Sequence, residues 1–243
     1  MKASAWLLRS ALAVMVFLPW AGARAAVIPT LFSTGVDSRG VVLPDGAAEQ
    51  HYRFATTDSV PTSATGPVSS TSIIVFQQTN AATPGNWTGD STTSAWIGPN
   101  NPDRRINPPG RYYYSTIFDL TGFDPATARI VGYMSGDDVV ANVRLNVTQT
   151  PVITNYDPAD RTAGYTRPYM FTLDHGFVAG LNFLEFRVDN GVDPATGSET
   201  ATGFRAQLLS DAAVLVPEPA SMAVLGAGLL GAGLLGAGRR RRG

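Results

Sequence analysis

Short runs in which apolar and polar residues alternate set the strongest limit on the fold of this chain. The clearest run covers residues 112–120. A period of two is typical of a strand with one buried face, and almost no stretch shows the 3.6-residue period of an amphipathic helix. One predicted face of this run carries Tyr112, Tyr114, Thr116, Phe118 and Leu120, and the other carries Tyr113, Ser115, Ile117 and Asp119.

Other segments repeat this pattern between clusters of turn residues. In the run 139–147, the odd-numbered residues are expected to face inward. Asp124–Thr127 is expected to form one helical turn, with Asp124 as its N-cap and Pro125 at the first position. The remaining predicted strands are 184–188, 204–208, 28–32, 50–55, 72–77, 129–134 and 169–173. Strands of this length and spacing predict an all-β fold, a two-sheet antiparallel jelly-roll-like sandwich.

The segments between the strands differ in length. Residues 56–71 and 190–203 are polar and rich in turn residues, which predicts long loops. Residues 80–107 form the longest strand-poor stretch and contain two tryptophans. We therefore expect one sandwich domain over residues 26–209, followed by a short linker at 210–216.

The first 25 residues have the three parts of a secretory signal peptide. Lys2 and Arg9 supply positive charge, residues 10–20 form an apolar run, and Ala23-Arg24-Ala25 is a small-x-small cleavage site. We expect a helical signal peptide over 1–25 that is cut after Ala25. An uncleaved N-terminal anchor is the alternative, although its apolar core is short for a membrane span.

Residues 217–243 predict a membrane-address segment. They begin with Pro217-Glu218-Pro219, continue without charge from Ala220 to Gly238, and then carry Arg239, Arg240, Arg241 and Arg242. Nineteen helical residues extend about 28 Å, close to a hydrocarbon core of about 30 Å. The arginines are expected to stay cytoplasmic, so the residues before Pro217 face away from the cytoplasm.

This segment resembles the PEP-CTERM sorting signal of Gram-negative bacteria, which combines a Pro-Glu-Pro triplet, a hydrophobic helix and an arginine cluster. The resemblance implies that an exosortase, a membrane protease-transpeptidase, cuts near Pro217-Glu218-Pro219. The precursor would be anchored in the inner membrane, and the product would reach the cell envelope or the extracellular space. A permanent single-span anchor in the periplasm is the alternative.

Composition narrows the partners of the exported part. Residues 26–216 contain eighteen acidic residues, eleven arginines and no lysine, a formal net charge of −7. This balance leaves no basic stripe for nucleic acid. The chain has no cysteine, which excludes disulfides, thiol nucleophiles and cysteine-based zinc sites.

Several phrases of the body are similar to PEP-CTERM sandwich domains. They are Thr34–Asp37, Glu49–Tyr52, Ala95–Ile97, Tyr114–Ala128, Gly180–Phe186 and Gly203–Arg205. The resemblance implies a galactose-binding-like β-sandwich, a shape used for carbohydrate recognition, adhesion and protein contact. Such domains often have a Trp and an Asp-Asn pair where this chain has Tyr133–Asp138, so no particular ligand is implied.

Aromatic and arginine side chains are the best candidates for a sugar-binding surface. Aromatic rings stack on the apolar face of a pyranose, and arginine donors bind its hydroxyls. Trp87, Trp96, Arg104 and Arg105 form the candidate set, beside Tyr112–Tyr114. Glycine and asparagine flank Trp87, which is therefore expected on a loop. The alternative places Trp96 and two of the tyrosines in the core.

Acidic and histidine residues suggest no catalytic motif, and we predict that the protein is not an enzyme and needs no cofactor. Asp137 and Asp138 are candidate ligands for a structural Ca²⁺, against the alternative of an Asp turn. His51 is expected to pack or to donate a hydrogen bond at a strand end. Glu185 is expected on a solvated face, and Glu49 and Glu199 are the other glutamates of the mature part.

These observations together predict an exported structural or adhesive protein of the cell envelope or biofilm matrix. Its expected partners are an exosortase-type protease, the membrane and exopolysaccharide. The alternative is an envelope enzyme that acts on polysaccharide through two carboxylates that converge in a cleft.

Overall fold

Eleven strands and one short helix form the regular structure of the computed structural model, which describes residues 25–56, 73–77, 86–99, 106–146, 148–149 and 163–216. In chain order they are β1 (Ala25–Val27), β2 (Arg53–Ala55), β3 (Ile73–Phe76), β4 (Trp96–Pro99), β5 (Gly110–Asp119), β6 (Phe123–Asp137), β7 (Val139–Leu145), β8 (Thr148–Gln149), α1 (Ala163–Thr166), β9 (Tyr169–Leu173), β10 (Leu181–Asn190) and β11 (Gly203–Leu215). The predicted all-β class is confirmed.

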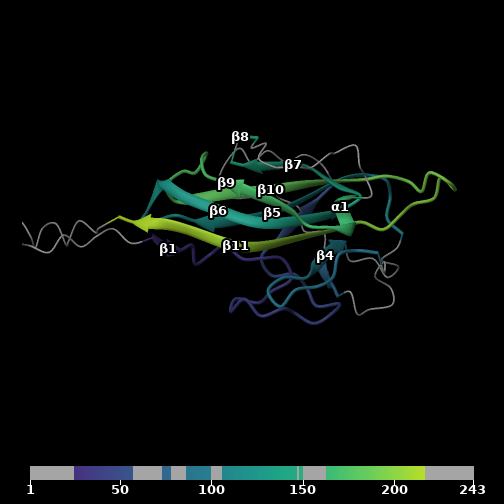
Figure 1. Ribbon diagram of the computed structural model, residues 1–243, viewed down its shortest axis with the longest axis horizontal. Helices are drawn as coiled ribbons and strands as arrows, with labels where there is room; N and C mark the ends of the chain where they lie inside the picture. The colour runs from purple at the N-terminus through teal and green to yellow at the C-terminus, as the bar shows by residue number, and fades with distance from the viewer. Residues whose placement is uncertain are drawn as a thin grey trace, which may run out of the picture.

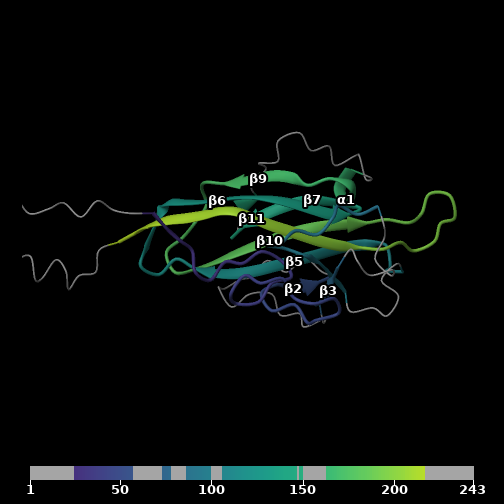
Figure 2. The same ribbon diagram turned by 60° about the horizontal axis from the view of Figure 1, so that its bottom comes forward.

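The strands form two antiparallel sheets, which lie one over the other in Figures 1 and 2. The first sheet has the order β3-β4-β11-β6-β9, and β1 also pairs with β11. The second has the order β2-β5-β10-β7-β8. β11 pairs with β4 through Phe204 and with β1 through residues 212–214, so two short strands share one of its edges.

Aromatic rings from both sheets meet between them. The ring centroid of Phe204 on β11 lies 5.2 Å from that of Tyr114 on β5 and 4.7 Å from that of Phe186 on β10. All three side chains are fully buried. The prediction for residues 112–120 is confirmed, because Tyr112, Tyr114, Phe118 and Leu120 belong to this core.

The prediction for the inward face of β7 is only partly right. Val143 and Leu145 belong to the core, but Val140 joins them where Ala141 was expected. β7 pairs Asn142 with Arg187 and Val140 with Val188 of β10, which leaves Ala141 as an extra residue. Such a β-bulge reverses the alternation beyond it.

The helical turn predicted at Asp124–Thr127 is wrong, because these residues lie in β6. Asp124 pairs with Val214 and Arg129 with Ala212 of β11, so the segment between them bulges out of the ladder. The Asp124 carboxylate accepts a hydrogen bond from the Ala126 N–H at 3.0 Å, and the Thr127 hydroxyl donates to the Asp124 carbonyl at 2.7 Å. Asp and Pro promote a local bend here, as expected, but within a strand.

Two further predictions are wrong at the ends of the domain. The 28–32 segment contains a turn in which the Leu31 N–H donates to the Ile28 carbonyl. The linker expected at 210–216 continues β11, which pairs with β1 and β6 as far as Leu215. The start of the domain, β1, pairs with the end of the domain, β11. Residues 210–216 therefore have a strand partner that their own sequence does not reveal.

Different strands begin and finish at the two ends of the sandwich, the tail end and the distal end. At the tail end, β5 and β11 finish and β6 and β10 begin, as the pairs Leu181–Asp119 and Leu215–Phe123 show. At the distal end, β5 and β11 begin and β10 finishes; it lies at the right of Figure 1. Across the described part of the chain, no helix has the length and apolar character needed to cross a membrane.

Candidate functional site

Both tryptophans of the predicted sugar-binding set are buried. Trp87 is 4% exposed and Trp96 is fully buried, and their ring centroids lie 4.3 Å apart. They form a small apolar cluster with Phe76 and Ala201. Trp87 lies outside the strands, as expected, but its ring has no free face for a sugar, so its assignment to a ligand platform is wrong, as is that of Trp96.

A hydrogen bond explains why Trp87 folds inward. Its indole N–H donates to the Asp137 carboxylate at 2.7 Å. Gly203 lies directly against the indole ring, where a Cβ atom would approach within 2.5 Å of it. The absence of a side chain at residue 203 therefore provides the space that the ring fills.

The other two residues of the predicted sugar-binding set, Arg104 and Arg105, lie outside the described residues. The same holds for the whole sorting motif, from Pro217, Glu218 and Pro219 to Arg239, Arg240, Arg241 and Arg242. These predictions remain predictions.

The Asp137-Asp138 pair takes part in structural hydrogen bonds. Asp137 accepts from Trp87, and the Asp138 carboxylate accepts from the Gly191 N–H at 2.8 Å. Asp138 thus binds the backbone of a distant loop rather than its own turn. Among the residues that the structure describes, no group of three or more acidic or histidine side chains is placed to hold a metal ion.

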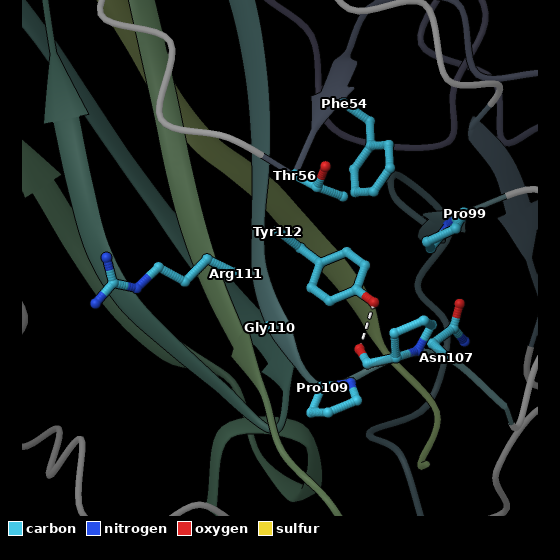
Figure 3. A pocket seen from close by; sticks show the side chains of 9 residues that line it. Phe54, Thr56, Pro99, Asn107, Pro109, Gly110, Arg111 and Tyr112 are labelled. Carbon is cyan, nitrogen blue, oxygen red and sulfur yellow. Dashed lines mark hydrogen bonds between the residues drawn. The ribbon is translucent and has the colours of Figure 1, made fainter.

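A pocket of about 400 Å³ opens at the distal end, and we call it the rim pocket. It lies where the edge strand β2 pairs with β5 and where the chain enters β5. Its lining is mainly aromatic and proline side chains, as Figure 3 shows. The lining residues are Phe54, Thr56, Pro99, Asn107, Pro108, Pro109, Gly110, Arg111 and Tyr112.

Strand pairing brings the two aromatic rings of the pocket together. Phe54 is opposite Tyr114 across the β2–β5 ladder, and its ring stacks on that of Tyr112 with centroids 5.5 Å apart. Diagonal neighbours in an antiparallel pair are within reach of aromatic side chains. The ladder therefore sets the position of this wall.

The proline corner of the pocket is held from inside. The Tyr112 hydroxyl donates to the Pro108 carbonyl at 2.5 Å, the dashed line in Figure 3. The Asn190 amide donates to the carbonyls of Asn107 and Pro108 at 3.2 and 3.1 Å. Asn190 in turn accepts from the Thr200 hydroxyl at 3.1 Å, which ties the corner to the loop before β11.

The chemistry of the pocket suits binding. Burial raises the pKa of the Tyr112 phenol, and the negative charge of Glu199 adds to this effect, while the Asn190 amide opposes it. The phenol therefore keeps its proton at neutral pH and remains the donor to the Pro108 carbonyl. Thr56 and Asn107 add polar groups to an apolar wall, whereas the guanidinium of Arg111 points away from the two rings in Figure 3.

Glu185 does not occupy the position expected of it. Glu185 is 4% exposed rather than solvated, because its carboxylate pairs with the Arg144 guanidinium at 2.7 Å. The Glu49 carboxylate accepts hydrogen bonds from the N–H groups of Gly35, His51 and Tyr52. Both glutamates are therefore engaged in holding the fold, and neither lines the rim pocket.

His51 packs at the start of the second sheet. Its ring stacks on Phe32 with centroids 3.9 Å apart, which agrees with the packing role expected for it. It also lines a smaller hollow of about 250 Å³ beside Arg53 and Ser115.

Sequence reasoning missed the rim pocket, although two signals pointed toward it. Asn107–Gly110 is a turn cluster of two prolines and a glycine, and three tyrosines follow it. Phe54, however, is more than fifty residues away in sequence, and only the β2–β5 pairing brings it to Tyr112. No protein-family model, curated protein sequence or solved structure matches this chain.

Proposed function

We propose that this chain is an exported protein of the cell envelope or extracellular matrix that is sorted by an exosortase, has a structural and adhesive role, and binds exopolysaccharide in the rim pocket. The observation that carries the first part is the ordered set at 217–242: a Pro-Glu-Pro triplet, nineteen uncharged residues and four arginines. A signal peptide at 1–25 agrees with export.

The position of the rim pocket supports a binding role for an anchored domain. The ten residues of β5 begin at the rim pocket and finish at the tail end. The pocket and the tail end therefore lie about 30 Å apart along the strand. A domain held at its tail end would present the pocket away from the membrane. Polymer in the surrounding matrix could then reach the pocket without approaching the lipid.

The composition of the pocket supports a sugar as its ligand. About 400 Å³ is within the range of about 300–1,000 Å³ that is common for small-ligand sites. Pro108 and Pro109 are exposed and offer an apolar surface for the carbon face of a pyranose, above the buried rings of Phe54 and Tyr112. The hydroxyl of the exposed Thr56 is suited to bind a sugar hydroxyl at the edge of the pocket.

A blocking variant tests the sugar-binding part. Thr56→Trp places an indole at the rim from an exposed position, and Thr92→Trp, also exposed, is its matched control. We expect the full chain to be retained on immobilised bacterial exopolysaccharides, and Thr56→Trp to weaken this about tenfold, a loss of about 1.4 kcal/mol. Equal binding by both variants, or no retention on any polymer, would contradict sugar binding in the rim pocket.

The intact mass of the native product tests the sorting part. In cells with the sorting protease, we expect the mature chain to begin after Ala25 and to lack the arginine cluster. Without the protease, the mass should include residues up to Arg242. A product that keeps its arginines in both strains would instead support the permanent anchor.

A further inference from the structure

Four exposed aliphatic side chains gather at the tail end of the sandwich. Val178 and Leu181 are each 47% exposed, Leu215 is 49% exposed and Val216 is 51% exposed. We call these four residues the tail-end apolar patch. They come from two different parts of the chain, the start of β10 and the end of β11.

Backbone hydrogen bonds hold these two parts beside one turn. The Leu120 N–H donates to the Gly180 carbonyl at 2.8 Å, and the Val216 N–H donates to the Gly122 carbonyl at 2.8 Å. The turn between β5 and β6 thus lies between the two halves of the patch. Phe123 and Phe177 pack against the core behind it, so the patch has a rigid support.

The spacing of the sequence brings this patch close to the predicted membrane span. Val216 is fixed by its hydrogen bond to Gly122, and the uncharged run begins at Ala220. Four Cα-to-Cα steps reach at most about 14 Å. A chain anchored by residues 220–238 therefore cannot carry the tail end far from the lipid.

The charges at the tail end are mostly acidic, with Arg129 near Asp174 as a positive charge. Asp119 and Asp124 flank the turn, and Asp174 precedes the segment that leads to Val178. Asp174 pairs with His175 at 2.7 Å. This arrangement does not favour attraction to anionic headgroups, so contact with a bilayer would depend on the apolar side chains.

We propose that the tail end of the sandwich rests on the non-cytoplasmic surface of the lipid bilayer, with the tail-end apolar patch inserted into the interface. This inference depends on the anchoring by residues 220–238 that the proposed function includes. Aliphatic side chains at an interface bury about 5–10 Å into the headgroup and acyl boundary. The domain would then stand upright on the membrane, with the rim pocket at its far end.

A fluorescent label tests the insertion. Because the chain has no cysteine, Leu181→Cys in the full chain gives one site for an environment-sensitive probe. Ala195→Cys, in the exposed distal loop, is the matched control. In phosphatidylcholine vesicles, we expect the probe at 181 to shift to the blue and to be quenched by nitroxide-labelled lipid several-fold more strongly than the probe at 195.

A second variant separates insertion from simple nearness to the membrane. Leu215→Asp, added to Leu181→Cys, places a charge in the patch without altering the anchor. We expect it to return the emission of the probe at 181 to that of the probe at 195. Anionic lipid and added salt should change the signal little.

Flotation of the vesicles distinguishes the two proposals. If the chain floats but the probe at 181 behaves like that at 195, the insertion is overturned and the anchor stands. If the chain does not float, the anchoring part of the proposed function is overturned, and the insertion with it. If the signal at 181 disappears as the protein-to-lipid ratio is lowered, a second copy of the chain covers the patch, which also overturns the insertion.

Discussion

Two buried asparagines at opposite ends of β10 do similar work beneath very different surfaces. At the tail end, Asn182 donates to the carbonyls of Val178 and Gly180 and accepts from the Val178 N–H and the Asn146 amide. At the distal end, Asn190 donates to the carbonyls of Asn107 and Pro108 and accepts from Thr200. Asn182 holds the loop that precedes β10, and Asn190 holds the segment that leads into β5.

The surfaces above the two asparagines differ. Asn182 supports exposed aliphatic residues beside the predicted anchor, while Asn190 supports a proline corner that shapes a pocket. The same side-chain chemistry therefore supports an apolar surface at one end and a pocket at the other. The loops, rather than the strands, set the difference between the two ends.

The largest expected effect is at the distal end, from Trp87→Ala. Loss of a buried ring packed on Trp96, together with the donor to Asp137, should lower the free energy of unfolding by about 4 kcal/mol. Trp87→Phe keeps a ring but removes the N–H donor, so we expect about half that loss. Denaturant unfolding measures both. Equal losses would show that the hydrogen bond, not the packing, dominates.

Asn182→Ala should follow, with a loss of about 3 kcal/mol. Four short hydrogen bonds converge on its amide, and buried groups left unpaired cost about 1–3 kcal/mol. Because the change is at the tail end, the affinity of the rim pocket for polysaccharide should stay within about twofold of the wild type. A matching fall in affinity would contradict the separation of the two ends.

Asn190→Ala should cost less stability, about 2 kcal/mol, because its bonds are longer and fewer. Its effect on binding should be larger, since the corner of Pro108 loses its internal support. Denaturant unfolding and polysaccharide retention should be measured on the same samples. Asn182→Ala should lose more stability, and Asn190→Ala should lose more binding. Thr200→Val removes the hydroxyl that donates to Asn190 and to the Gly191 carbonyl, and it should show a weaker form of the same effect.

Asp211, on β11 toward the tail end, predicts a pH dependence. Burial raises the pKa of its carboxyl to about 6, so the folded state holds a proton that the unfolded chain releases near pH 4. Stability should therefore fall as pH rises from about 4 to about 6, by about 1 kcal/mol once partial exposure is allowed for. Asp211→Asn should remove this slope. Burial also raises the pKa of Glu49, so the wild type and Asp211→Asn share that contribution. The measurement is therefore the difference between their free energies of unfolding across this pH range.

The sequence alone predicts the sandwich well, since residues such as Tyr114 and Phe118 of β5 do face the core at every second position. The other face of this strand is also covered, because Tyr113 and Ser115 are buried. It fails at β4 and β7 for identifiable reasons. Trp96–Pro99 is buried on nearly all its residues, so no alternation shows, and the bulge at Ala141 depends on its partner in β10. The prediction of a linker at 210–216 is wrong because the strand partner of this segment, β1, is almost 190 residues away in sequence.

The candidate site was harder to predict than the fold. Glycine and asparagine beside Trp87 correctly indicate a loop, but they do not reveal an acceptor fifty residues away at Asp137. Tryptophan is thus a poor guide to an exposed platform when a distant carboxylate can satisfy its N–H. Phe54 and Tyr112 are the buried rings beneath the rim pocket, and strand pairing brings them together.

The smallest expected effect is Leu181→Ser at the tail end. Its side chain is nearly half exposed, so its loss should change the free energy of unfolding by at most about 0.5 kcal/mol, far less than Asn182→Ala one residue away. Denaturant unfolding of Leu181→Ser and Asn182→Ala measures the two losses. An aliphatic residue that adds little to folding is free to serve another contact, and the same variant should reduce the lipid quenching of a probe placed at Val178. A loss near 2 kcal/mol would instead mean that Leu181 belongs to the core, and the patch would lose one of its four members.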